Sequence, residues 1–178
     1  MNEYRQIFGA ELFSVIGGVL AGTLLAIFTD RLELLPGILI LLPGYLEAMN
    51  SIYGSLSARL GSSLHMGNLE PTFKKKQSVL TANIFTVIFL TLGASAFLGL
   101  VAIAANYIIF RVLTLSLFFV PVIASLVSIV VLLPTTTISS FFLFKQGLDP
   151  DNVMGPIVTT TGDIFNVIAL LIAIVVIV

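Results

Sequence analysis

Residues 153–178 read VMGPIVTTTGDIFNVIALLIAIVVIV, and this long apolar segment contains a single charged residue, Asp163. A helix of this length is long enough to cross a bilayer, which takes about 20 apolar residues. A carboxylate at the centre of such a helix costs roughly 2.5–3.5 kcal/mol on insertion scales. Carboxylates at this depth face a polar pathway, a partner charge or a bound cation. Asp163 is therefore the first candidate for a functional residue.

The composition of the rest of the chain agrees with a membrane protein. Of its 178 residues, 58% are hydrophobic and 10% are charged, whereas soluble domains carry about 25% charged residues. The apolar residues form continuous stretches, which is typical of membrane-spanning helices. We therefore expect an all-α, polytopic membrane protein with one transmembrane domain over residues 1–178. Its five spans are predicted at 7–28, 35–64, 78–109, 113–144 and 153–178.

Several classes of function are excluded or disfavoured by residue content. The net charge of −1 gives no reason to expect nucleic acid as a partner. The absence of cysteine excludes disulfides, thiolate metal sites and cysteine nucleophiles, and a lone histidine cannot build a zinc site within one subunit. No HExxH motif or nucleotide-binding glycine loop is present. An intramembrane protease would need paired acids, for which Asp163 with Glu47 is a weak candidate, so we do not expect an enzyme.

The placement of lysine and arginine predicts the orientation in the cell membrane. Basic residues gather on the cytoplasmic side of membrane proteins. A cytoplasmic N-terminus and an outer C-terminus satisfy this rule best. In that orientation Arg5, Lys74, Lys75, Lys76 and Lys145 lie inside, and Arg31 and Arg111 lie outside.

The last segment carries a polar stripe around Asp163. Asn152, Thr159, Asp163 and Asn166 are seven, four and three residues apart, which places them on one face of a helix. Such a stripe with a carboxylate at its centre is what a pore-lining helix requires. The alternative is hydrogen bonding between helices, which suffices for Thr159 and Asn166 but compensates an ionised carboxylate poorly.

The start of this segment, Asp149-Pro150-Asp151-Asn152, has the pattern of a helix N-terminus. Asp149 is the expected N-cap and Pro150 the first helical residue. Asp149 and Asp151 are also candidates for the mouth of a cation path, together with Asn152. The capping role and the mouth role are compatible.

The second segment contains Pro43-Gly44, where we expect a broken helix, followed by a run of polar residues. Broken helices expose carbonyl groups that can line a water-filled path. Glu47 is either a second cation-facing carboxylate or the partner of Arg59 or a lysine, and both interpretations stay open. Asn50 is a further candidate for the path, and Arg59 is expected to be structural.

Two stretches resemble a known family. LDPDNVMGPIVTTTGD, residues 148–163, is similar to the last-helix signature of MgtE magnesium channels and their solute-carrier relatives, in which DP or DPDN precedes P-x-V-T-[ST]-x-x-D. Residues 43–67, with SLSARLGS, are similar to the second-helix motif P…GN…LASRLS…G. The family's Gly-Asn reads Asn50-Ser51 here, which leaves the ligands from that helix open.

The resemblance implies a parallel homodimer with a pore on its axis. Asp163 would face its twin and hold a largely hydrated Mg²⁺, and Gly155, Thr159 and Asn166 would contact the water shell through oxygen atoms. Mg²⁺ keeps most of its waters in proteins and accepts few carboxylates, which suits one acid per chain. MgtE proteins also carry cytosolic sensor and CBS domains. Neither is present in this sequence, so gating by that route would need a separate regulatory subunit.

Together these features predict a dimeric channel or transporter for divalent cations, with Mg²⁺ as the expected ion and no organic cofactor. Two alternatives stay open at this point. One is a secondary exchanger of a cation against protons or sodium, and the other is a non-transporting membrane subunit in which Asp163 stabilises assembly.

Overall fold

The computed structural model describes residues 3–33, 35–73, 76–148 and 150–177, and every element in these ranges is helical. The five long helices confirm the all-α prediction, and a short helix, α2, lies between the first two of them. The helices are α1 (Glu3–Ile27), α2 (Thr29–Glu33), α3 (Ile38–His65), α4 (Ser78–Phe110), α5 (Ser116–Lys145) and α6 (Pro150–Ile177).

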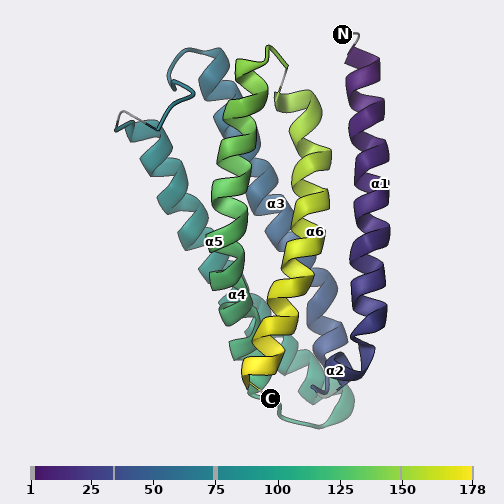
Figure 1. Cartoon of the computed structure of the whole chain (residues 1–178). Helices are drawn as coiled ribbons and strands as arrows, with labels where there is room; N and C mark the ends of the chain where they lie inside the picture. Colours follow the sequence, from purple (N-terminus) through teal and green to yellow (C-terminus); the bar gives the residue numbers. More distant parts are fainter. Residues whose placement is uncertain (1–2, 34, 74–75, 149, 178) are drawn as a thin grey trace.

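The long helices run alternately up and down, so the two chain ends lie at opposite ends of the bundle (Figure 1). The last helix, α6, packs against α1, α3 and α5 and is the central element. In the described ranges α1 contacts only α6 and α2, and it stands at the edge of the bundle (Figure 1). The site of interest on α6 is therefore flanked by α1 on one side and by α3 on the other.

Within the described residues, four helices are long and apolar enough to cross a membrane: α1 from Ile7, α4, α5, and α6 from Val153. Most of their outward side chains are apolar, as a lipid-facing surface requires. Phe89 on α4, for example, is 81% exposed. The helix α3 has 28 residues but is richer in polar side chains and is not among the four. Its crossing of the membrane stays a prediction.

The expected break at Pro43-Gly44 is wrong, because α3 is continuous from Ile38 to His65. Pro43 is the sixth residue of the helix, so its missing N–H leaves only the carbonyl of Leu39, near the helix start, without its usual donor. The helix α5 likewise continues through Pro134. There the hydroxyl of Thr135 donates to the carbonyl of Val131 at 2.6 Å, which adds a bond in the turn that the proline disturbs.

The core of the bundle is built on one face of α3. Its buried side chains are spaced by three or four residues, which is the spacing of a single helix face. They include Tyr45, Met49, Tyr53, Leu56 and Leu60, none of which is more than 1% exposed. The opposite face of α3 carries small and polar residues, so the rotation of this helix separates an apolar packing surface from a polar one.

Candidate cation site

Asp163 lies in the middle of α6 and is half-buried. Its carboxylate oxygen Oδ1 accepts a hydrogen bond from Nδ2 of Asn50 on α3, with 2.7 Å between the two atoms. The structure thus joins two candidate residues that are 113 positions apart in sequence. In the described ranges no Lys, Arg or His forms an ion pair with Asp163.

Gly162 makes the contact between Asn50 and Asp163 possible. A Cβ atom at position 162 would collide with the carboxamide oxygen of Asn50. Any side chain at this position would therefore push Asn50 away from α6. The sequence shows Gly162 directly before Asp163. The role of this glycine becomes visible only when the residue opposite it, Asn50, is known.

Asn166 lies one turn further along α6 and is fully buried. Its side-chain oxygen accepts a hydrogen bond from the hydroxyl of Ser128 on α5 at 2.7 Å, and that hydroxyl is 3.1 Å from the Tyr45 hydroxyl of α3. Asn166 is thus part of a hydrogen-bonded group that joins three helices. Sequence reasoning missed Ser128 and Tyr45, although a tyrosine in an apolar helix is expected to need a polar partner.

The polar stripe of α6 is accessible only over part of its length. Gly155 and Thr159 are exposed, Asp163 is half-buried, and Asn166 is fully buried. The hydroxyl of Thr159 donates to the carbonyl of Gly155 at 3.0 Å, so its oxygen keeps lone pairs for another donor such as a water. Asp163 therefore lies where the exposed part of the stripe passes into the protein interior.

A second exposed stripe lies on α3, with Glu47, Ser51 and Ser55 four residues apart. Glu47 is exposed on the same helix as Asn50. Its pairing with Arg59 is excluded, because twelve residues of helix separate the two by about 18 Å along the axis. The Nε and Nη2 atoms of Arg59 are buried and have no hydrogen-bond partner in the described part of the chain. The interpretation of Glu47 as a cation-facing acid stays a prediction.

A family model described as divalent cation transporter, MgtE, matches residues 42–173. This chain belongs to the MgtE family. The match runs from α3 to α6 and includes Asn50, Asp163 and every residue between them. No curated protein and no solved structure matches the chain.

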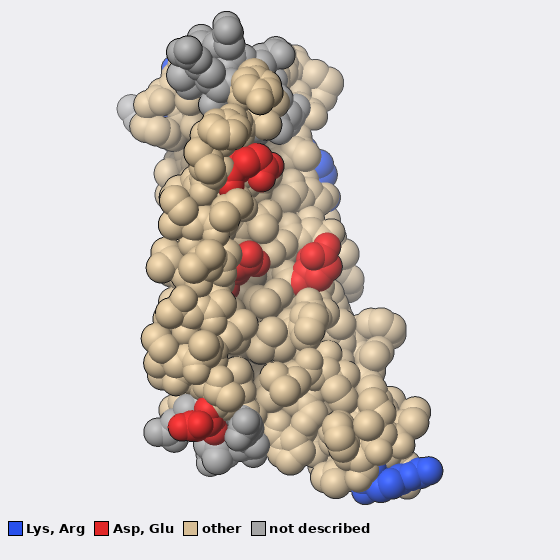
Figure 2. All heavy atoms as spheres, turned by 90° about the vertical axis from the view of Figure 1, so that its right-hand side faces the viewer, with Lys and Arg blue, Asp and Glu red and all other residues tan. Residues whose placement is uncertain are grey.

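Membership in the MgtE family confirms the predicted resemblance and identifies a multi-pass membrane transporter of divalent cations rather than an enzyme. The surface charge of the face that carries α1 is compatible with such a cargo. Figure 2 shows acidic side chains at mid-height of this face as well as nearer its ends, and basic side chains at its edges. One acid that sequence reasoning did not single out is Glu11, which is exposed on α1 inside its candidate span. Acidic side chains near a path raise the local concentration of cations.

Three of the predicted site residues of this MgtE-family chain have side chains that lie outside the described part of the structure. Asp149 lies outside the described residues, and α6 begins at Pro150, as predicted. The side chains of Asp151 and Asn152 are also not described. In the described part of the chain no three His, Cys, Asp or Glu side chains are close enough to hold a metal ion.

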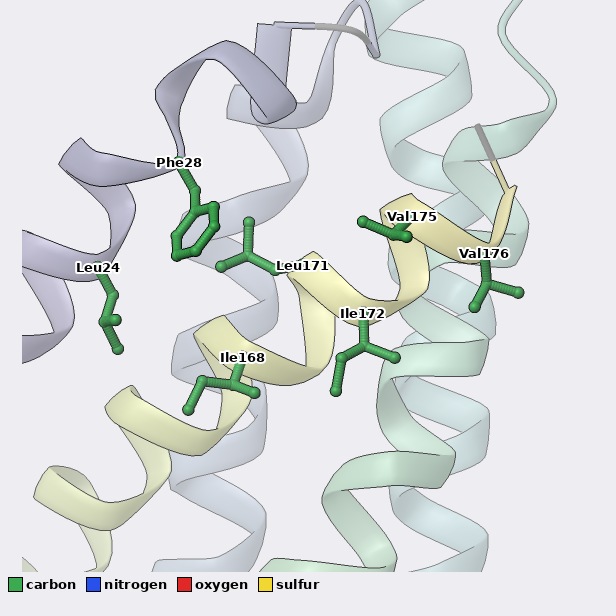
Figure 3. A pocket seen from close by; sticks show the side chains of 7 residues that line it. All are labelled: Leu24, Phe28, Ile168, Leu171, Ile172, Val175 and Val176. Carbon is green, nitrogen blue, oxygen red and sulfur yellow. The ribbon is translucent and has the colours of Figure 1, made fainter.

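A groove of about 500 Å³ between α1 and α6 is a poor route for a cation. All of its lining side chains are hydrocarbon, as Figure 3 shows. Mg²⁺ and Ca²⁺ require oxygen ligands or water, which such a surface does not offer. The lining residues are Leu24, Phe28, Ile168, Leu171, Ile172, Val175 and Val176. The exposed stripes of α3 and α6 are therefore the better candidates for the ion path.

Proposed function

We propose that this MgtE-family chain conducts Mg²⁺ through a pore on the axis of a homodimer, with Asp163 as the carboxylate that selects the ion. The observation that carries the proposal is the place of Asp163: it is half-buried in mid-helix, hydrogen-bonded to Asn50, and not neutralised by a basic side chain of the described residues. Such a carboxylate is stable at membrane depth when a cation compensates its charge.

The chemistry of the stripe favours a hydrated ion. Mg²⁺ gives up its waters reluctantly and is bound through one or two carboxylates. Thr159 and the backbone of Gly155 offer oxygen atoms to the water shell on the exposed part of α6. The Asn166 side chain, being buried, would act on the ion through its neighbours rather than by direct contact.

The homodimer supplies what one chain lacks. A single chain places one carboxylate at this depth of α6, and two copies related by a twofold axis provide two negative charges for a divalent ion. Five helices can hardly enclose a hydrated path, whereas the exposed stripes of two copies can face each other across the axis. The bilayer and the second copy are thus the expected partners.

The proposed topology places five spans, including α3, in the cell membrane with the N-terminus in the cytoplasm. The connection of α3 to α4 and that of α5 to α6 lie at the same end of the bundle as the N-terminus (Figure 1). Lys76 lies in the first of these connections, and Lys145 lies directly before the second. The positive-inside rule places both lysines in the cytoplasm. Asp149 and Asp151 would then be at the cytoplasmic mouth. Gating by a separate regulatory subunit belongs to the same proposal.

The test is Mg²⁺ uptake into proteoliposomes that contain a fluorescent Mg²⁺ indicator. Replacing Asp163 by Ala or Asn removes the charge that compensates the ion, and we expect uptake to fall at least about tenfold, or 1.4 kcal/mol. The thermal stabilisation of the purified dimer by Mg²⁺ should be lost as well, whereas dimer formation should survive. Glu70→Gln, in the exposed loop after α3, is the control acid and should transport normally.

Each other outcome has a definite reading. Normal uptake by the Asp163→Ala variant would contradict the selectivity role of the carboxylate. Failure of the same variant to form a dimer would favour the assembly subunit. Uptake driven by a pH gradient alone would favour the exchanger.

A further inference from the structure

The carboxamide of Asn50 has no atom free for an ion. Its nitrogen donates to Asp163, and its oxygen is buried against Gly162 without a hydrogen-bond partner among the described residues. A pore-lining ligand would need at least one atom that faces water or the ion. Asn50 is half-buried and directs both of its polar atoms at α6. It is therefore placed to act on Asp163 rather than on the cargo.

A second buried amide lies beside Asn50. Nδ2 of Asn166 has no hydrogen-bond partner among the described residues either. A Cβ built on Gly162 would lie 3.6 Å from this nitrogen and would overlap the oxygen of Asn50. An unpaired donor and an unpaired acceptor thus lie around the same glycine. Because burying either group alone is unfavourable, a small side-chain rotation or one bridging water that joins them is favoured.

Two hydrogen-bonded groups thus meet at this glycine. Nδ2 of Asn50 on α3 donates to Asp163 of α6 at 2.7 Å. The hydroxyl of Ser128 on α5 donates to Asn166 of α6 at 2.7 Å and is 3.1 Å from the Tyr45 hydroxyl of α3. A bond between the two unpaired amide groups would join both groups into one polar network. The bond from Asn50 by itself already limits the rotation of the Asp163 carboxylate.

We infer that Asn50 is a positioning residue for Asp163: it occupies the oxygen Oδ1 and leaves Oδ2 as the oxygen that meets the hydrated cation. This inference rests on the proposed function of Asp163. A carboxylate held through one oxygen binds in a monodentate manner. That suits the rigid octahedral shell of Mg²⁺, whereas Ca²⁺ readily takes both oxygens of a freely rotating carboxylate. Asn50 therefore contributes to the preference for Mg²⁺ over Ca²⁺.

The test uses two substitutions of Asn50 and one of its neighbour. Asn50→Ala removes the side chain, and Asn50→Leu keeps a similar volume without the donor. Gly162→Ala retains Asn50 but displaces it by the added Cβ. For all three we expect the Mg²⁺ concentration for half-maximal uptake to rise about tenfold, together with a lower ratio of Mg²⁺ to Ca²⁺ uptake. Gly93→Ala is the matched control, because a Cβ at this glycine of α4 meets no atom within 4 Å.

The double variant Asn50→Ala with Gly162→Ala separates positioning from general damage. Both changes break the same contact, so the double variant should be no worse than Asn50→Ala alone. Multiplied effects would contradict the inference.

The half-saturating concentration does not depend on how much protein folds. A variant that loses yield or thermal stability but keeps the half-saturating concentration and the ion preference would show a merely structural role for Asn50. That result would overturn the inference. If the Asn50 variants resemble the parent while Asp163→Ala loses uptake, the inference fails and the proposed function stands. If Asp163→Ala transports normally, the proposed function itself fails.

Discussion

At the scale of single residues, the hydroxyl of Ser128 on α5 connects three helices. It donates to Asn166 of α6 and pairs with Tyr45 of α3, and all three residues are fully or almost fully buried. In a membrane protein such hydrogen bonds stabilise the fold because the buried polar groups have no alternative partners. Loss of this one hydroxyl leaves two buried polar groups unpaired.

We therefore expect Ser128→Ala to lower the free energy of unfolding by about 0.6 kcal/mol, the mean measured for hydrogen bonds between membrane helices, and by no more than about 1.7 kcal/mol, the largest value. The measurement is unfolding in mixed detergent micelles. Ser125→Ala is the control, since this buried serine of the same helix donates to the carbonyl of Val122 in its own helix. Equal effects of the two substitutions would mean that the contact between helices adds nothing.

Sequence reasoning at this scale identified Asp163 and Asn50 but not their relation. The energetic argument for Asp163 is local, because a carboxylate in an apolar segment is visible in the sequence itself. The hydrogen bond between the two depends on Gly162 and on how α3 and α6 are rotated. The same holds for Asn166, whose spacing places it in line with Thr159 although the packing buries it.

At the scale of helices, α1 docks on α6 through small residues. Among the α1 residues whose side chains are described, the buried ones are Ala10, Gly17 and Ala21, which lie seven and four positions apart. A Cβ on Gly17 would collide with the side chain of Thr160 on α6. Small residues at such interfaces let two helices approach closely, which is a main source of attraction between helices in lipid.

Gly17→Ala should therefore destabilise the bundle by about 1–3 kcal/mol through overpacking. Gly18→Ala is the matched control, because Gly18 directly follows Gly17 and has open space where its Cβ would lie. Alanine is the better helix former by roughly 0.5–1 kcal/mol, so this control should be neutral or slightly stabilising. Thermal unfolding of both variants in detergent measures the difference, and a neutral Gly17→Ala would argue against the close α1–α6 contact.

The five long helices lie on the apolar segments of the sequence, because a helix satisfies its backbone hydrogen bonds within its own segment. The expected break at Pro43 did not occur. The rule that proline breaks a helix considers only the backbone hydrogen bond that is lost at that residue. In α3, the packed side chains on either side of Pro43 keep the helix continuous. Local rules thus located the elements better than they located their irregularities.

At the scale of the whole molecule, the open question with the largest consequence is whether α3 crosses the membrane. If it does, the connection before α3 and the loop after it lie on opposite sides. The chain has no cysteine, so single-cysteine variants report one position each. Asp30 and Met66 are both exposed and flank α3.

We expect Asp30→Cys and Met66→Cys to react with a membrane-impermeant thiol reagent from opposite sides in intact cells and inverted vesicles. Met66→Cys should react from the cytoplasmic side, together with Gln146→Cys. Leu113→Cys, between α4 and α5, should react from the side of Asp30→Cys. Labelling of positions 30 and 66 from the same side would contradict a membrane crossing by α3 and, with it, the five-span topology.

The class of the protein, its all-α character, its family and the acid in the middle of α6 all follow from the amino-acid sequence alone. These properties follow from the composition of each segment and from short motifs. The tertiary structure alone decided that Asn50 binds Asp163, that Asn166 turns inward to Ser128 and Tyr45, and that Gly17 and Gly162 are contact points between helices. The physical reason is that hydropathy defines each helix separately, whereas the residues that meet across helices depend on how the packed side chains set the rotation and spacing of those helices.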